Sequence, residues 1–248
     1  MPYRKIPNTD TGRLEALRAI HTKANNTPQE NLAISAENFN KLKIFLPIFQ
    51  KEIEERGTAL SVQSEATTQR MAAEEKCRLF VSHFYQVFNL GVAREKYKVS
   101  ERAYFQLDIN QESLPDIRTS ESLCTWAENI ISGDPKRVAA GSAEMINPSR
   151  AEVETVYNEY VTKLNVQSTK KDAYEKEQKD VENLRVEADD LIRDIWDEIE
   201  FKFRKDEPSA MRRKAKQYGV IYINRPGEVI AEEPLAAESK TEQPAPAK

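Results

Sequence analysis

The sequence predicts a mainly α-helical fold: an elongated, internally duplicated bundle with two long antiparallel heptad-patterned helices, short flanking helices and a small two-stranded β element. Three observations lead to this prediction. Only 7 of the 248 residues are glycine, which is few for a fold of many short strands and tight turns. Apolar residues recur at heptad spacing over two long stretches. Similar segments also recur about 110 residues apart.

The duplication is most visible in one pair of segments. "TPQENLAISAENFN" at 27–40 and "DPKRVAAGSAEMIN" at 134–147 share six identical residues in fourteen positions, where chance would give about one. Four more pairs follow in the same order, the last being "AYFQLDIN" at 103–110 with "QYGVIYIN" at 217–224. This collinearity predicts a tandem duplication.

The repeat divides the chain into three parts. Copy one spans residues 1–112, copy two spans residues 113–226, and a tail spans residues 227–248. Each copy is predicted to contain a short helix, a long helix and a strand. The tail is rich in Pro, Ala and Glu, so we expect it to be disordered.

The short helix of copy one is predicted over 10–25, with Asp10 or Thr11 as its N-cap and a leucine-rich face toward the core. Its counterpart in copy two is predicted over 120–132, where apolar residues again recur at helical spacing. A turn at Pro135 is expected to end this second helix, because proline lacks a backbone donor.

The long helix of copy one is predicted to follow the Ser-Ala-Glu stretch and to reach Phe88, with Leu60 among the residues of its apolar seam. Pro47 is expected to kink this helix or to mark its true start. In copy two the long helix is predicted to run from Asn147, as N-cap, to about Arg204. In both helices the middle is polar and the ends are apolar. An antiparallel arrangement would place the two polar middles side by side and the apolar ends against each other, related by a pseudo-twofold axis.

The two Ser-Ala-Glu stretches are interpreted as the same structural corner in both copies. Glu37 and Glu144 are expected in the first turn of the long helices, where the helix dipole favours a carboxylate. After the long helices, 103–109 and 218–224 alternate apolar and polar residues and are predicted as short strands. These strands are expected to pair with each other or with the extended N-terminal residues.

Few residues indicate catalysis. His83 lies among apolar residues and is interpreted as a packed histidine, and neither it nor His21 has a metal ligand at helical spacing. Cys77 and Cys124 show no metal-ligand spacing and are interpreted as reduced thiols. The chain carries no nucleotide-binding or hydrolase motif. We therefore expect no cofactor, no metal and no enzymatic activity.

The acidic stretch "DDLIRDIWDEIE" at 189–200 leaves an alternative open. Asp190, Asp194, Asp197 and Glu198 follow one side of the predicted helix, and such a stripe can bind divalent cations. A solvated face is the commoner arrangement. An enzyme with a site at the pseudo-twofold axis, using Asp190 and Asp194, is kept as an alternative.

The basic segment 202–219 is the candidate binding site for an anion or a partner. Its proposed binding residues are Arg204, Lys205, Arg212, Arg213, Lys214 and Lys216. Clustered cations attract phosphate groups, nucleic acid or an acidic partner. The alternative is a solvated helix end whose cations complement the helix dipole.

Aromatic residues on the long helices exceed what two paired helices can bury, so we expect protein partners and self-association into a homo-oligomer. The predicted function is therefore that of a non-enzymatic structural or adaptor protein, with a nucleic-acid or anion-binding module as the alternative. The net charge of −4 is not typical of nucleic-acid binders. No apolar run approaches a membrane span, and we expect a cytoplasmic protein.

Overall fold

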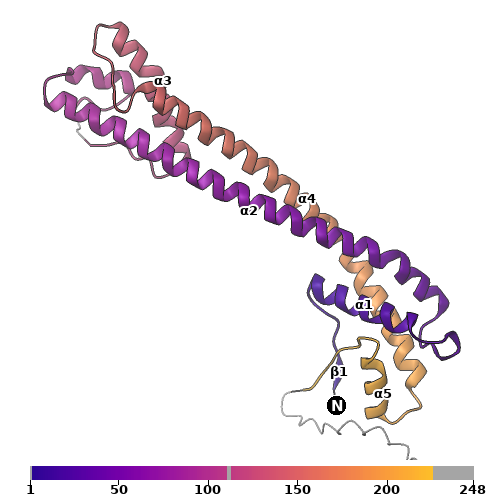
Figure 1. Ribbon diagram of the computed structural model, residues 1–248. Helices are drawn as coiled ribbons and strands as arrows, with labels where there is room; N and C mark the ends of the chain where they lie inside the picture. The colour runs from indigo at the N-terminus through magenta and orange to yellow at the C-terminus, as the bar shows by residue number, and fades with distance from the viewer. Residues whose placement is uncertain (1, 111–112, 226–248) are drawn as a thin grey trace, which may run out of the picture. The chain divides into compact units, whose positions relative to one another are not determined.

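The computed structural model describes residues 2–110 and 113–225, which are mainly helical (Figure 1). They form two compact units. The terminal unit comprises residues 2–50 and 184–225, and the middle unit comprises residues 51–183. The predicted disorder of the tail lies outside the described residues.

Two long helices contribute to both units. The first is α2 (Ala36–Ala93), which is continuous through Pro47. The second is α4 (Arg150–Phe203). The prediction of one unbroken helix of some fifty residues in each half of the chain is confirmed.

The terminal unit also contains a small sheet and short helices. Its further elements are β1 (Tyr3–Arg4), α1 (Asp10–Asn25), the 3₁₀ helix η1 (Gln29–Asn31), α5 (Pro208–Lys216) and β2 (Tyr222–Ile223). The strands pair antiparallel, with Tyr3 opposite Ile223. Of the two pairings expected for 218–224, pairing with the N-terminal residues is confirmed, although only two residues of that range are strand.

The bounds of α1 agree with the prediction, but its cap does not. The hydroxyl of Thr9 accepts a hydrogen bond from the backbone N–H of Gly12 at 3.1 Å, so Thr9 is the N-cap rather than Asp10 or Thr11. Leu17 and Ile20 are fully buried on the inner face of the helix. In the same unit, α4 has Ile192, Ile195 and Ile199, spaced three and four residues apart, fully buried on one face.

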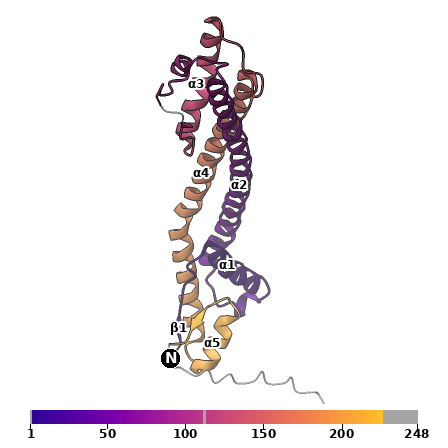
Figure 2. The same ribbon diagram turned by 90° about the vertical axis from the view of Figure 1, so that its left-hand side faces the viewer.

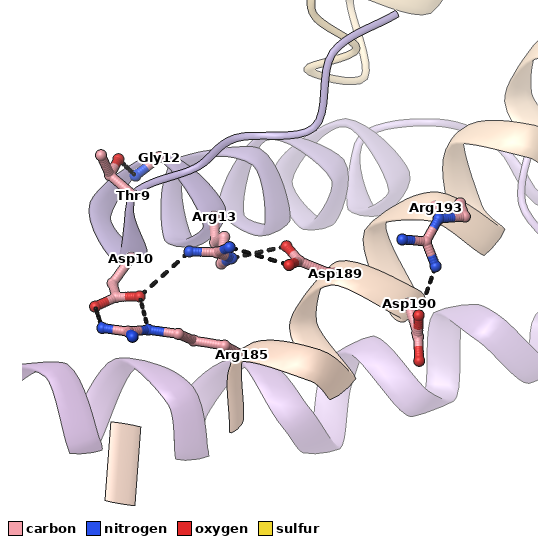
Figure 3. Close-up of polar contacts among 8 residues, drawn as sticks. All are labelled: Thr9, Asp10, Gly12, Arg13, Arg185, Asp189, Asp190 and Arg193. Atoms are coloured by element: carbon pink, nitrogen blue, oxygen red, sulfur yellow. Dashed lines mark hydrogen bonds and ion pairs between the residues drawn. The ribbon is translucent and has the colours of Figure 1, made fainter. Parts of the chain in front are cut away.

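A chain of ion pairs joins α1 to α4 within the terminal unit (Figure 3). Asp10 accepts hydrogen bonds from Arg185 at 2.8 and 3.0 Å, and lies 3.4 Å from Arg13. Arg13 in turn donates to both carboxylate oxygens of Asp189 at 2.7 and 3.0 Å. Asp10 is only 8% exposed, and its charge is compensated by Arg13 in the same helix and by Arg185, which is 175 positions away in the sequence.

The middle unit contains η2 (Val99–Phe105) and α3 (Ser120–Ala139) beside its parts of α2 and α4. Lys76 of α2 bonds Glu159 of α4 at 2.9 Å, and Gln69 bonds Lys163 at 2.9 Å. Because the lower-numbered residue of α2 meets the higher-numbered residue of α4, the helices run antiparallel in this unit. Both views show them side by side there (Figures 1 and 2).

The predicted strand at 103–109 is wrong. Residues 99–105 form a 3₁₀ helix that ends at Gln106, which has a φ of 59°. Phe105 and Leu107 are buried in an aromatic core. A strand would also place these two side chains on one face, so the alternating pattern does not distinguish a strand from this 3₁₀ turn. The backbone of Tyr104 packs so closely on Gly133 of α3 that a Cβ there would collide with its carbonyl oxygen.

Helix α3 is longer than predicted, because Pro135 lies inside it rather than in a turn. The turns that follow Pro135 are held by Arg137, whose side chain is fully buried. Its guanidinium bonds Asp134 at 2.7 and 3.0 Å and Ser142 at 2.6 Å, and lies 3.3 Å from Glu101. This network offsets the backbone hydrogen bond that proline removes.

The carboxyl group of Glu101 is tuned by that network. Burial raises its pKa, but hydrogen bonds from Ser142, from the backbone N–H of Lys98 and from Arg137 outweigh burial and lower it overall. Glu101 is therefore a stabilising anion in the middle unit.

The corner preceding α4 differs from the one preceding α2. Ser35 caps α2 at the N–H of Asn38, and Glu37 lies in the first turn as predicted. Residues 142–147 instead form a loop, so the placement of Glu144 in a first turn and of Asn147 as N-cap is wrong. Helix α4 begins at Arg150 after a capping box: the Ser149 hydroxyl accepts from the N–H of Glu152, whose carboxylate accepts from the N–H of Ser149.

Two further side chains are not where the sequence placed them. His83 is exposed on α2, so its interpretation as a packed histidine is wrong. Leu60 is 47% exposed, and the small side chains of Ala66 and Ala73 are buried instead. Small residues occupy these inner positions because they let the two long helices approach closely.

Candidate partner-binding groove

A groove of about 760 Å³ lies in the terminal unit, between the segment that enters α2 and the last turns of α4. It is lined by Leu32, Ala33, Ile34, Ser35, Asp197, Glu198, Phe201, Lys202, Arg204 and Lys205. Two of the six basic residues predicted to bind a partner, Arg204 and Lys205, are therefore part of its wall.

Glu198 fixes one side of the groove. Its carboxylate accepts a hydrogen bond from the backbone N–H of Ser35 at 2.8 Å and another from the side chain of Asn38 at 2.9 Å. Because these contacts join the start of α2 to α4, the segment 32–35 is held as a defined wall. The residue predicted as part of a metal-binding stripe is thus a structural clamp.

The apolar part of the groove ends in an exposed aromatic ring. Ala33 and Ile34 are buried at 4% and 6% exposure, whereas Phe201 is 65% exposed. The guanidinium of Arg204 lies 3.6 Å from the centroid of the Phe201 ring, a cation–π contact. The wall therefore presents an apolar surface with a cation directly beside it.

The charged side chains of the groove are unequally engaged. Asp197 pairs with Arg4 at 2.6 Å, and Glu198 accepts the two hydrogen bonds described above. Among residues 2–110 and 113–225, no acidic side chain pairs with Lys202, Arg204 or Lys205. The groove therefore offers three uncompensated cations to a ligand, while its carboxylates are already occupied.

The remaining predicted binding residues lie on α5, which does not line the groove. Lys214 pairs with Asp206 at 2.8 Å. Arg213 and Lys216 are exposed, and Arg212 is half-buried. The structure thus divides the predicted cluster into a groove part and a surface part on α5.

Helix α5 is started by an acidic cap within the basic segment. The Glu207 carboxylate accepts hydrogen bonds from the N–H groups of Ser209 at 2.9 Å and Ala210 at 3.3 Å. Hydrogen bonding from the Ser209 side chain is the largest influence on the pKa of Glu207 and lowers it. This carboxylate therefore compensates the helix N-terminus.

The other carboxylates of the predicted acidic stripe are ion-paired or exposed. Asp190 pairs with Arg193 at 2.5 Å (Figure 3), and Asp194 is exposed. Asp197 and Glu198 are engaged in the contacts described above, and among the described residues none of these four carboxylates belongs to a cluster of three acidic side chains close enough together to hold a metal ion.

A different acidic trio lies in the middle unit. Glu52, Glu177 and Asp180 are the carboxylates of the described residues close enough together to hold a metal ion. Lys176 lies 3.5 Å from Glu177 and 3.8 Å from Asp180. Lys51 lies 3.9 Å from Glu52. Two ammonium groups thus lie beside the three carboxylates, as in a solvated ion-pair cluster.

The two thiols are unsuited to nucleophilic chemistry in this environment. Cys77 is fully buried, and burial raises its pKa to about 12. Burial also raises the pKa of Cys124. Because the thiolate is the nucleophile, both side chains are held in their unreactive form at neutral pH.

Phe201 and the segment 32–35 were not identified from the sequence. One local signal was available, because Phe201 interrupts the polar face of an amphipathic helix between Glu200 and Lys202. The contribution of 32–35 had no such signal, since it depends on the contact of Ser35 with a residue of α4.

Comparison with known proteins adds no functional assignment. No helix within the described residues is both long and apolar enough to cross a membrane. No family model, no curated protein and no solved structure matches this chain.

Proposed function

We propose that this protein is a non-enzymatic adaptor that binds protein partners, and that the groove at the end of α4 is its docking site. The supporting observation is the combination of Phe201, 65% exposed, with three cations that have no acidic partner among the described residues. A peptide with an apolar side chain flanked by carboxylates complements this surface.

The exposed ring supplies most of the expected binding energy. A phenylalanine side chain buries about 200 Å² when fully covered. Covering the exposed 65% of Phe201 at about 25 cal/mol per Å² contributes roughly 3 kcal/mol. Carboxylates placed near Lys202 and Lys205 would add specificity and a faster association rate more than affinity.

The proposal includes the tandem duplication inferred from the sequence. Residues of α2 and α4 that are 111 positions apart share full burial, which supports it. The fully buried pairs include Cys77 with Ala188, Val81 with Ile192, Phe84 with Ile195, Tyr85 with Trp196, and Phe88 with Ile199. The caps of α1 and α3, Thr9 and Thr119, are likewise related by 110 positions.

The duplication also explains why one copy would carry the docking site. The position equivalent to Phe201 is Leu90, which is 55% exposed. Lys202, however, corresponds to Gly91, and Arg204 corresponds to Ala93. Lys205 corresponds to Arg94. Both copies thus expose an apolar side chain at this point, but copy two carries three cations at these positions and copy one carries only one.

A selection from a random peptide library tests the proposed docking site. The wild-type chain is expected to enrich peptides with an apolar residue flanked by Asp or Glu. The variant Phe201→Ser is expected to lose this enrichment, and the matched control Leu90→Ser is expected to keep it. If no acidic–apolar consensus emerges, or if both variants behave alike, the groove is not the docking site.

Self-association is the second part of the adaptor proposal. On α2, Met71 and Leu79 are 58% and 65% exposed, which is a large apolar area for a solvated helix. Light scattering is expected to give a mass above one chain, and Leu79→Asp is expected to lower it. A single-chain mass at all concentrations would exclude self-association.

Nucleic-acid binding through α5 is the alternative function. It is favoured by Arg213 and Lys216, which are exposed and form no ion pair within the described part of the chain. A salt-dependent shift with single-stranded RNA, lost when Arg212, Arg213 and Lys214 are all replaced by alanine, would support it. Absence of binding at low salt would exclude it. The enzyme alternative gains no support from Asp190, which is paired with Arg193.

A further inference from the structure

We propose that residues 228–235, with the sequence EVIAEEPL, occupy the groove of their own chain and block it until a partner competes. This inference rests on the proposed function, because it assigns an occupant to the docking site. The segment follows β2 and lies outside the described residues.

The charge of the segment complements the groove. Residues 226–237 contain Glu228, Glu232 and Glu233 and no lysine or arginine. The groove carries three cations, and none of them has an acidic partner within residues 2–110 and 113–225. Among the described residues, no acidic side chain therefore competes with the glutamates of the segment for the cations of the groove.

The apolar residues of the segment complement the exposed ring. Val229, Ile230 and Leu235 lie between or beside the glutamates. This is the pattern of an apolar anchor flanked by carboxylates, which the exposed Phe201 and its neighbouring cations would select. The distal tail after Glu238 contains no Val, Ile, Leu, Phe or Met, so the anchor can come only from the first part of the tail.

The chain leaves β2 close to the groove. The hydroxyl of Tyr222 donates a hydrogen bond to Glu200 of α4 at 2.6 Å, and Glu200 precedes Phe201 in the sequence. The described residues end at Arg225, three residues after this contact. Ten extended residues from Arg225 to Leu235 span up to roughly 35 Å, whereas Lys205, five residues from Glu200, lies at most roughly 18 Å from it.

The same chain is favoured over a second copy by effective concentration. A short tether holds its segment at a local concentration on the order of millimolar. A weak groove–peptide contact is then sufficient for occupancy within one molecule, while the same contact between two molecules would require comparable protein concentrations. A segment that is expected to be disordered when free can adapt to such a groove on binding.

Occupancy by the tail would make the groove regulated. A partner with the same acidic–apolar chemistry must displace the segment before it binds, so the apparent affinity falls by the fraction of molecules with a free groove. Any change that weakens the tail contact would then strengthen partner binding.

A competition experiment with the full-length chain tests the inference. The probe is a fluorescein-labelled peptide of residues 226–239, and its binding is followed by fluorescence anisotropy. The variant carrying Val229→Asp, Ile230→Asp and Leu235→Asp is expected to bind the probe at least tenfold more tightly than the wild type. The control Ala245→Asp with Ala247→Asp adds charge to the distal tail and is expected to behave as wild type.

A second substitution locates the binding event. Adding Phe201→Ser to the triple variant is expected to reduce probe binding at least tenfold, whereas adding Leu90→Ser is expected to leave it unchanged. The altered residues of the triple variant lie after β2, and circular dichroism is expected to show the wild-type helix content.

The remaining outcomes overturn the inference in distinguishable ways. Equal probe affinity for the wild type and the triple variant would show that the groove takes the peptide but is not blocked by the tail, and the docking function would stand. No binding to either chain would remove the tail as a ligand, and the library selection would decide the docking function separately. A light-scattering mass that falls in the triple variant would assign the segment to the groove of a second copy instead of its own.

Discussion

Replacement of Asp10 by asparagine tests the ion-pair chain that joins α1 to α4 in the terminal unit. The substitution keeps the size of the side chain and removes its charge. In the wild type, Asp10 accepts from Arg185 at 2.8 and 3.0 Å and lies 3.4 Å from Arg13. The asparagine would leave two guanidinium groups facing each other without an intervening carboxylate.

The expected magnitude follows from burial. Two unit charges about 4 Å apart interact by about 4 kcal/mol at an effective dielectric constant of about 20. Removing one partner of a fully buried pair costs about 3–5 kcal/mol, whereas an exposed pair contributes about 0–1 kcal/mol. Asp10 is 8% exposed but Arg185 is 36% exposed, so we expect a loss of about 2–3 kcal/mol, between these limits.

Hydrogen exchange of the α1 backbone amides measures this loss locally. At about 1.4 kcal/mol per factor of ten, the amides of α1 are expected to lose roughly 30- to 150-fold in protection. The matched control is Asp190→Asn, whose pair with Arg193 is exposed at both ends at 58% and 49%. This control is expected to change protection by less than about threefold.

A double-mutant cycle separates the pair from its surroundings. Asp10→Asn and Arg185→Met, measured singly and together, are expected to show a coupling energy of about 1–2 kcal/mol. The reasoning is refuted if Asp10→Asn changes the α1 amides no more than Asp190→Asn does. An additive cycle would show that Arg185 does not contribute to the compensation of Asp10.

Three further predictions concern the middle unit. The pKa of Glu101 is lowered in the folded state. Its contribution to the free energy of unfolding is therefore fully present above the unfolded pKa of about 4.3 and is lost as pH falls through the lower folded value. Glu101→Gln should reduce the free energy of unfolding at pH 7 and should flatten the acid side of a plot of urea midpoint against pH. Cys77, with its pKa raised to about 12, should react with iodoacetamide at pH 8 at least tenfold more slowly in the native than in the urea-unfolded chain, as measured by mass spectrometry. Gly133→Ala should destabilise the unit by about 2–4 kcal/mol in thermal unfolding, because the added Cβ would collide with the carbonyl oxygen of Tyr104. In the control Gly57→Ala, the added Cβ meets nothing within 4 Å. This control should stabilise the unit by about 0.5–1 kcal/mol.

Each of these predictions has an opposing result. An unchanged acid profile in Glu101→Gln would mean that the hydrogen bonds of the Arg137 network contribute no net stability. Equal alkylation rates in the two states would mean that α2 opens readily around Cys77. Equal effects of the two glycine substitutions would mean that the close approach of η2 to α3 is not maintained in solution.

The helices were the most predictable part of the fold because their signals are local. The 3.6-residue period of α1 places Leu17 and Ile20 on one face, and its predicted bounds agree with the structure. The period-2 signal of 103–109 failed because seven residues with two inward apolar side chains satisfy a strand and a 3₁₀ turn equally. The predicted start of α4 is wrong because both Asn147-Pro148 and Ser149 with Glu152 match the sequence pattern of a helix start, and the capping box of Ser149 and Glu152 is the one that forms.

The candidate site was only half predictable. Arg204 and Lys205 were found from the density of positive charge in one segment, which is a property of neighbouring residues. Phe201 directly precedes this segment, yet its importance depends on what faces it. The same charge count included Lys214, which the fold engages with Asp206, so composition could not separate groove residues from the rest.

The sequence by itself determined the helical class, the two long helices and the basic segment, since periodicity, glycine content and charge density are encoded within a few turns of chain. The tertiary structure alone decided that Asp10 meets Arg185 and that Glu198 clamps Ser35. These contacts join residues more than 160 positions apart, and no local pattern specifies such a pair, because the contact forms only when burial of both helices' apolar faces brings the two segments together.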